Sequence, residues 1–156
     1  MTAYVGIDPG MTGGIAYVTA TGVLGDCVQM PTHDGEVSGW MLAQILEVYR
    51  EDIQDRMVVV VENVHSMPKQ GVSSTFKFGK SFGIVLGVVQ GMGLPMHRVT
   101  PQAWKKTHTL IGKDKDASRG LATELWPSMS MHWSRKKDNG VSDAALIAEH
   151  ARRENL

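Results

Sequence analysis

Along the 156-residue chain, hydrophobic residues occur in short strand-like runs and at helical spacing, and together the two patterns predict a mixed α/β fold. Three short apolar runs, separated by glycine-containing turns, predict an antiparallel β-meander over 4–8, 14–19 and 23–30. The segment Met57–Val61 is an unbroken and mostly β-branched run, which is typical of a parallel strand buried on both faces. A last strand is expected over 96–99.

Elsewhere the apolar residues recur at helical spacing. They predict helices over about 39–54, 75–91, 116–125 and 142–153. Ser38 and Ser142 stand where N-caps of the first and last helices are expected. The resulting order, βββαβαβαα, predicts a five-stranded mixed sheet flanked by helices, in a single domain spanning 1–156.

Four glycines recur every four residues in the helix predicted over 75–91, so they line one face. They are Gly79, Gly83, Gly87 and Gly91. Each costs about 1 kcal/mol relative to alanine in a helix, so something must offset that cost. A bare glycine face lets another backbone approach closely, either from the sheet or from a second copy of the chain. The sequence leaves both possibilities open.

Charge divides the chain into two halves whose sum is zero. Residues 1–68 carry a net charge of −7 and residues 69–156 a net charge of +7. Between Glu62 and Asp114 there is no acidic residue, but there are seven lysines and arginines. Such a segregated field favours a polyanionic partner on one face, although solvated surface charge also explains it.

Several residue types set limits on the chemistry. The single cysteine, Cys27, cannot form an internal disulfide, which favours a reducing setting. The histidines lack metal-ligand spacing, so no zinc site is expected. No signal peptide or membrane span is predicted, and we expect a cytoplasmic protein. The tryptophans at 40, 104 and 126 are interpreted as packing residues, and Trp133, in a basic stretch, is the best case for base stacking.

Three carboxylates stand where carboxylates are costly to bury. Asp8 ends the first strand, Glu62 ends the valine-rich strand, and Asp143 follows Ser142 at the predicted start of the last helix. If the two strands are neighbours, Asp8 and Glu62 lie side by side and repel each other. A divalent cation resolves that conflict, and all-oxygen ligands favour Mg²⁺ or Mn²⁺. Asp138 is the expected fourth carboxylate.

Four carboxylates beside a basic face suggest metal-assisted phosphodiester hydrolysis, in which two ions activate water and stabilise the leaving oxygen. A nearby lysine would neutralise the charge that develops on phosphorus. The candidates are Lys105, Lys106, Lys113 and Lys115.

The segments Gly6–Gly10, Val61–Val64 and Ser142–Ala148 together resemble the RuvC family of Holliday junction resolvases. The segments Gly71–Gly83 and Thr100–Lys106 are similar to its phage and prophage members. The resemblance implies an RNase H-like fold and a homodimer that makes paired nicks in four-way DNA junctions. It also implies two Mg²⁺ ions per active site, with Mn²⁺ as a substitute.

The resemblance assigns catalytic and metal-binding roles to Asp8, Glu62 and Asp143. The family's fourth acid lies three residues before the last aspartate, which here is Gly140, so Asp138 is expected to replace it. Lys105 matches a basic active-site residue, and either Lys113 or Lys115 matches another. The dimer is expected to form through Gly79, Gly83 and Gly87. Residues 63–77 and 98–119 are expected to contact DNA, through His65, Lys69, Lys77, Lys80, Lys105, Lys106, Lys113, Lys115 and Arg119. His65 stands where many members carry an aromatic junction wedge.

Three other functions remain open. The run Gly6–Gly10 also resembles the first phosphate loop of actin-like ATPases, although the chain is short for a second nucleotide-clasping domain. An RNase H-like enzyme could act on RNA or hybrids instead of branched DNA. A branched-DNA-binding protein with a degenerate metal site is the non-enzymatic alternative.

Overall fold

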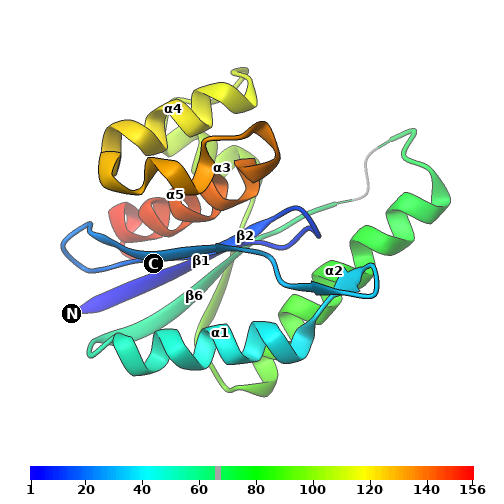
Figure 1. Ribbon diagram of the computed structural model, residues 1–156, viewed down its shortest axis with the longest axis horizontal. Helices are drawn as coiled ribbons and strands as arrows, with labels where there is room; N and C mark the ends of the chain where they lie inside the picture. Colours follow the sequence, from blue (N-terminus) through cyan, green and yellow to red (C-terminus); the bar gives the residue numbers. More distant parts are fainter. Residues whose placement is uncertain (66–67) are drawn as a thin grey trace.

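A five-stranded mixed sheet forms the middle layer of the computed structural model, which describes residues 1–65 and 68–156 (Figure 1). The strand order is β3-β2-β1-β6-β7. The first three strands pair antiparallel, and β1–β6 and β6–β7 pair parallel. The strands are β1 (Thr2–Asp8), β2 (Gly14–Val18), β3 (Leu24–Gln29), β6 (Arg56–Glu62) and β7 (Met96–Val99). The predicted meander and its parallel extension are confirmed.

Helices cover both faces of the sheet, with α1 and α2 on one side and α3, α4 and α5 on the other (Figure 1). No helix in the described ranges is long and apolar enough to cross a membrane. The helices are α1 (Gly39–Asp52), α2 (Val72–Gly91), α3 (Pro101–Thr107), α4 (Lys115–Leu125) and α5 (Asn139–Glu154), with 3₁₀ helices η1 (Pro127–Trp133) and η2 (Lys136–Asp138). A two-stranded hairpin, β4 (Thr32–His33) with β5 (Glu36–Val37), precedes α1.

Strand β6 is buried on both faces, as its sequence predicts. Val58 and Val60 pack into the apolar cluster under α5, whereas Val59 and Val61 pack into the cluster under α1 and α2. This alternation explains why the strand needs no polar face. It also places the strand's last residue, Glu62, between the two helical layers.

Helix α5 begins at Asn139, so the predicted cap at Ser142 is wrong. Ser142 is fully buried inside the helix, and its hydroxyl donates to the carbonyl oxygen of Asn139 at 2.9 Å. Serine can make such a bond to a preceding turn, which leaves it without a capping role. Asp143 therefore lies one turn inside the helix rather than at its positive end. By contrast, Ser38 caps α1, since its Oγ accepts from the backbone N–H of Met41 at 3.2 Å.

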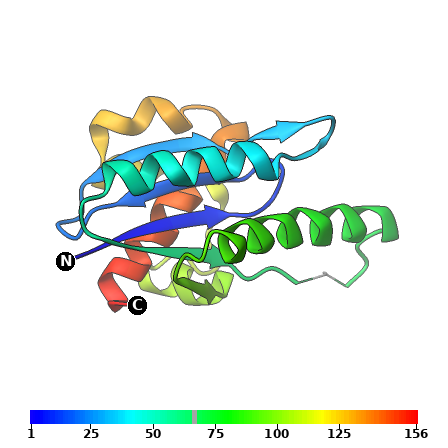
Figure 2. The same cartoon turned by 90° about the horizontal axis from the view of Figure 1, so that it is seen from below.

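The glycine face of α2 is open. At Gly79, Gly83, Gly87 and Gly91 an added Cβ would meet no atom of the described chain within 4 Å. The opposite face is the buried one, with Ser81, Val85 and Val89. Packing against the sheet therefore does not account for these glycines within the described residues. Figure 2 shows α2 projecting beyond the sheet.

Candidate active site

Two carboxylates lie side by side where β1 and β6 end. The parallel register pairs Ile7 with Val61, so the next residues along the two strands, Asp8 and Glu62, are neighbours at one sheet edge. Both side chains are half-buried. One oxygen of Asp8 accepts a long hydrogen bond from the backbone N–H of Gly10 at 3.5 Å, within the turn after the strand. The juxtaposition expected from the sequence is present.

Helix α5 brings Asp143 to the same edge by packing closely across β1 and β2. A Cβ at Gly6 would come within 3.0 Å of the carbonyl oxygen of Ala144, a separation that real Cβ atoms do not adopt. Gly14 meets the backbone of Gly140 with the same closeness. Only glycine permits this approach. Asp143, one residue before Ala144, therefore lies near the end of β1.

The three carboxyls, hereafter the carboxylate trio (Asp8, Glu62 and Asp143), all have raised pKa values. Burial, followed by the charges of Glu62 and Asp143, raises the pKa of Asp8 to about 8. Burial and the charge of Glu62 raise the pKa of Asp143 to about 7. The pKa of Glu62 is raised by burial and pulled back by a hydrogen bond from Trp104 and by Lys105 and Lys115. A clustered, desolvated set of carboxyls is a common feature of functional sites.

The trio fits a hard divalent cation by its donor chemistry. Asp143 Oδ1 is buried and has no hydrogen-bond partner among the described residues, and the same is true of Asn139 Oδ1 one helical turn earlier. As the side chains stand in residues 1–65 and 68–156, no three His, Cys, Asp or Glu side chains are positioned to hold one ion. Bare carboxylates repel one another, and a bound cation would remove that repulsion. Oxygen donors alone favour Mg²⁺ or Mn²⁺.

Two lysines act on the trio. The charge of Lys115 lowers the pKa of all three carboxyls, and that of Lys105 lowers those of Glu62 and Asp143. Lys115 is the first residue of α4, where the helix dipole disfavours a cation, so its place is not explained by helix stability. Of the two lysines that the sequence left open, Lys115 is the one whose charge lowers the pKa values of the carboxyls. One turn later, the Ser118 hydroxyl hydrogen-bonds Asp143.

Asp138 does not join the trio, which corrects the expectation of a fourth carboxylate there. Its buried carboxylate accepts from Gln29 Nε2 at 2.5 Å and from Arg135 Nε at 2.8 Å. The hydrogen bond from Arg135 holds the pKa of Asp138 below its usual range. Asp138 thus ties η2 to β3 and is fully engaged.

The family's own fourth position is closed as well. A Cβ at Gly140 would come within 3.0 Å of the carbonyl oxygen of Thr12 and the backbone of Gly13. No side chain fits there. The candidate site therefore has three carboxylates, and not the four that we expected.

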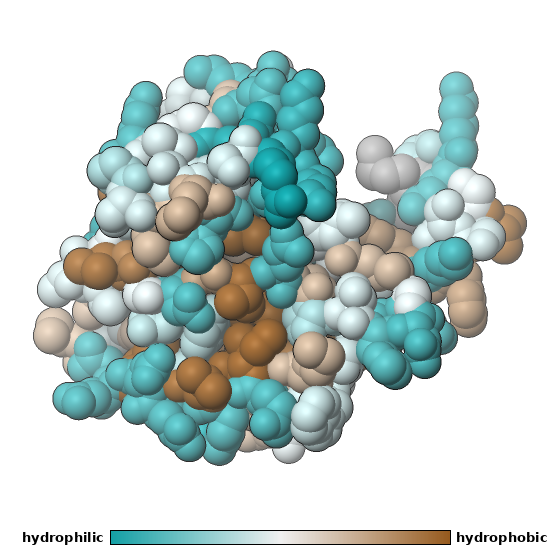
Figure 3. All heavy atoms as spheres, viewed as in Figure 1, coloured by the Kyte–Doolittle hydropathy of each residue, from teal (hydrophilic) through white to brown (hydrophobic). Residues whose placement is uncertain are grey.

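Some of the predicted DNA-contacting residues are partly buried or held by other residues, and the rest are exposed. Lys105 is half-buried beside the trio, and Arg119 is held by Asp116 and by the carbonyl oxygens of Trp133 and Ser134. Residues 66–67 of the predicted contact segment lie outside the described residues. The exposed members are His65, Lys69, Lys77, Lys80, Lys106, Lys113 and Lys115. Figure 3 shows hydrophilic side chains at the α4 end of the molecule on the face that it views.

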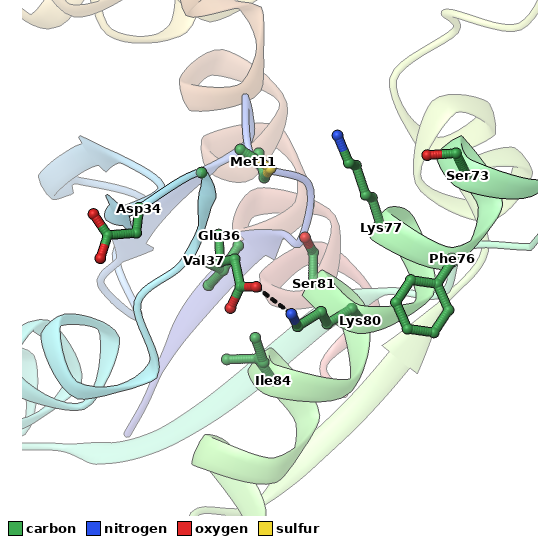
Figure 4. A pocket seen from close by; sticks show the side chains of 11 residues that line it. Met11, Asp34, Glu36, Val37, Ser73, Phe76, Lys77, Lys80, Ser81 and Ile84 are labelled. Atoms are coloured by element: carbon green, nitrogen blue, oxygen red, sulfur yellow. Dashed lines mark hydrogen bonds and ion pairs between the residues drawn. The ribbon is translucent and has the colours of Figure 1, made fainter.

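Among these exposed residues, Lys80 already has an ion-pair partner. It forms an ion pair with Glu36 of the β4–β5 hairpin, across a cavity of about 360 Å³ that Phe76 also lines. Figure 4 shows Lys77, one turn earlier on α2, extending away from that ion pair. Lys77 is therefore better placed than Lys80 for an anionic partner.

Two polar contacts of the trio were not predicted. Trp104 was interpreted as a packing residue, and it is buried, but its indole also reaches Glu62. Ser118 was not singled out at all. The available signal was helical spacing, because Ser118 lies three residues after Lys115 and shares its face.

Known proteins resemble the chain in sequence. It is 36% identical over 86 residues to the chloroplastic Holliday junction resolvase MOC1 of Chlamydomonas reinhardtii, a match that spans 54% of the chain and 10% of that protein. It is 28% identical over 150 residues to the crossover junction endodeoxyribonuclease RuvC of Nitratidesulfovibrio vulgaris, spanning 92% of the chain and 87% of that protein. No protein-family model matches.

Solved structures share the fold. Thermus thermophilus RuvC superposes with a TM-score of 0.62 at 20% identity, over 98% of the chain and 96% of that protein. The same protein in complex with a Holliday junction substrate gives a TM-score of 0.61. At this identity the likeness concerns the fold.

Proposed function

Because the chain is a RuvC-like protein with an RNase H-like fold, we propose that it is a metal-dependent endonuclease that resolves four-way and other branched DNA by paired nicks. The observation that carries the proposal is the carboxylate trio, with Lys105 and Lys115 acting on it. A carboxylate cluster beside lysines suits phosphodiester hydrolysis better than it suits binding alone.

In this proposal the trio holds Mg²⁺, two ions per active site, with Mn²⁺ as a substitute. Metal bound there would activate the attacking water and stabilise the leaving oxygen. The chain's own residues position the reaction and supply positive charge. The trio fixes the place of reaction at the sheet edge, and Lys105 and Lys115 supply positive charge where the phosphate becomes more negative. Of the two alternatives, Lys113 and Lys115, the proposal takes Lys115 as the second basic residue.

The DNA would lie along the exposed basic residues around this edge, from the segment after β6 to the start of α4. His65 and Lys69 precede α2, Lys77 lies on it, Lys106 lies on α3, and Lys113 lies just before α4. Lysine contacts to phosphate make binding fall steeply with salt. We propose that the protein acts in the cytoplasm of a bacterium or a phage-infected host.

Paired nicks require two active sites related by a two-fold axis, so we propose a homodimer. The open glycine face of α2 supports this interface, since it leaves space for a second helix.

Gly83→Leu would close that space and is expected to shift sedimentation from dimer to monomer. Gly120→Leu, at an equally open helical position on α4, is the control and should leave the dimer intact. A dimeric Gly83→Leu protein would contradict this interface.

The alternatives make different cleavage products. A labelled four-way junction, a flap, a linear duplex and an RNA–DNA hybrid are incubated with the protein and Mg²⁺. We expect cutting of the branched DNA. Cutting of the hybrid alone would favour the RNase H-like alternative, and junction binding without cutting would favour the degenerate binding protein.

A further inference from the structure

We propose that Trp104 is a positioning residue of this site, whose indole holds the carboxylate of Glu62 and the ammonium of Lys105 in fixed relation. The inference rests on the proposed function, because it concerns the same carboxylates. It assigns to a buried aromatic residue a role beyond packing.

The topology brings Trp104 to Glu62. Strand β7 pairs with β6 so that Val99 lies opposite Glu62, and α3 begins two residues later, capped by Thr100. Within the first turn of α3, Trp104 Nε1 donates to Glu62 Oε2 at 2.5 Å. One carboxylate oxygen of Glu62 is therefore fixed by the indole.

The indole is a rigid donor because its ring is enclosed. Trp104 is 1% exposed and belongs to the apolar cluster under α5, together with Val99, Leu110 and Leu146. A ring held in this way has little rotamer freedom, so the N–H points in one direction. A flexible donor on the surface would not hold the carboxylate in one orientation.

The same ring also contacts the neighbouring lysine. Lys105 Nζ lies 5.5 Å from the centroid of the Trp104 ring, a cation–π distance. Trp104 thus touches Glu62 through its edge and Lys105 through its face. Outer partners of this kind orient metal-binding carboxylates and commonly set metal affinity.

The plainer reading is that any buried indole finds some acceptor. Trp126 donates to the carbonyl oxygen of Gly22 at 3.0 Å, and Trp133 donates to Thr123 Oγ1 at 3.0 Å. Neither of these acceptors belongs to the trio. Trp104 differs because its acceptor is a carboxyl that loses hydration on burial, and the indole N–H offsets part of that loss. Trp126, 7% exposed and bonded to a backbone carbonyl, is the matched control.

The test is Mn²⁺ affinity, measured by electron paramagnetic resonance on wild type, Trp104→Phe and Trp126→Phe. Phenylalanine keeps most of the ring and removes the N–H. We expect Trp104→Phe to bind Mn²⁺ about 10-fold more weakly and Trp126→Phe to match wild type. Equal affinity in Trp104→Phe would overturn the positioning role while leaving the nuclease proposal in place. Absence of Mn²⁺ binding in wild type would overturn both.

A second measurement covers the case in which Trp104→Phe does not fold. The chain has four tryptophans, so four indole signals are expected in the wild-type ¹H–¹⁵N spectrum. Trp40→Phe, Trp126→Phe and Trp133→Phe would assign three of them and leave that of Trp104. We expect the Trp104 signal to shift on addition of Mg²⁺ more than the Trp126 signal does. An unmoved Trp104 signal, with Mg²⁺ bound, would overturn the inference.

Discussion

Gly6 on β1 lies directly against Ala144 on α5, with no room for a Cβ between strand and helix. This contact sets how closely Asp8, two residues after Gly6, approaches Asp143, one residue before Ala144. The contribution of the Asp143 charge to the raised pKa of Asp8 depends on that approach. A glycine in the fold thus determines the geometry of the candidate site.

Gly6→Ala is expected to destabilise the protein by about 1–3 kcal/mol, because the backbone of α5 must move to admit the methyl group. Urea unfolding measures the change. Gly120→Ala, at an open helical position, is the control and should stabilise by up to about 1 kcal/mol. Unchanged stability of Gly6→Ala would show that the helix–strand contact is looser than described.

The sequence predicted most of the fold, for physical reasons. The β-branched run of β6 and the helical spacing of α1 are strong local patterns, and both elements form where expected. Helix α3 and the β4–β5 hairpin were missed, because seven residues and two pairs are too short to show periodicity. Carboxylates ending adjacent strands were predictable from topology alone.

The rest of the site depends on contacts that no local pattern encodes. Asp138 was assigned to the carboxylates from its proximity in sequence to Asp143, but five residues of helix turn it away, toward Arg135 and Gln29. The indole of Trp104 reaches Glu62 only because β7 pairs with β6. Both contacts depend on the tertiary structure, so the spacing of residues in the sequence could not predict them.

Without metal, stability should fall as pH rises. The pKa of Asp8 is raised from 3.8 to about 8 in the folded protein, so the folded state keeps a proton that the unfolded chain releases. Deprotonation therefore favours unfolding throughout that window, and the loss is complete above about pH 8. The measurement is urea unfolding in EDTA for wild type and Asp8→Asn. We expect the difference between the two to grow from pH 4.5 to pH 8, with Asp8→Asn the more stable; a constant difference would contradict the raised pKa.

Lys115 and Lys113 form a matched pair for the second basic role. Lys115→Ala is expected to lower the rate of junction cleavage about 100-fold, because it removes a charge that acts on all three carboxylates. Lys113→Ala removes an exposed lysine of the preceding loop and should mainly weaken DNA binding at low salt, with a smaller dependence of binding on salt. Single-turnover rates separate the two effects. Equal rate losses would contradict the assignment of Lys115.

Asp138 and Asp143 should respond in opposite ways to the same substitution. Asp138→Asn is expected to cost about 2 kcal/mol of stability, because it weakens the hydrogen bonds to Gln29 and Arg135, and to leave Mn²⁺ affinity unchanged. Asp143→Asn should weaken Mn²⁺ binding more than 10-fold, since it removes a charged ligand. Calorimetry with Mn²⁺ and thermal unfolding record both properties. Weakened Mn²⁺ binding by a stably folded Asp138→Asn protein would restore Asp138 as a ligand.

The most direct test of the account is a mapped cleavage reaction on a four-way DNA junction with wild type and Asp8→Asn, each with Mg²⁺ and with EDTA. The account predicts symmetric nicks in two opposing strands by wild type with Mg²⁺ only. It also predicts that Asp8→Asn binds the junction without cutting it. Cleavage that persists in Asp8→Asn, or in EDTA, would contradict the assignment of the carboxylate trio as a metal-dependent nuclease site.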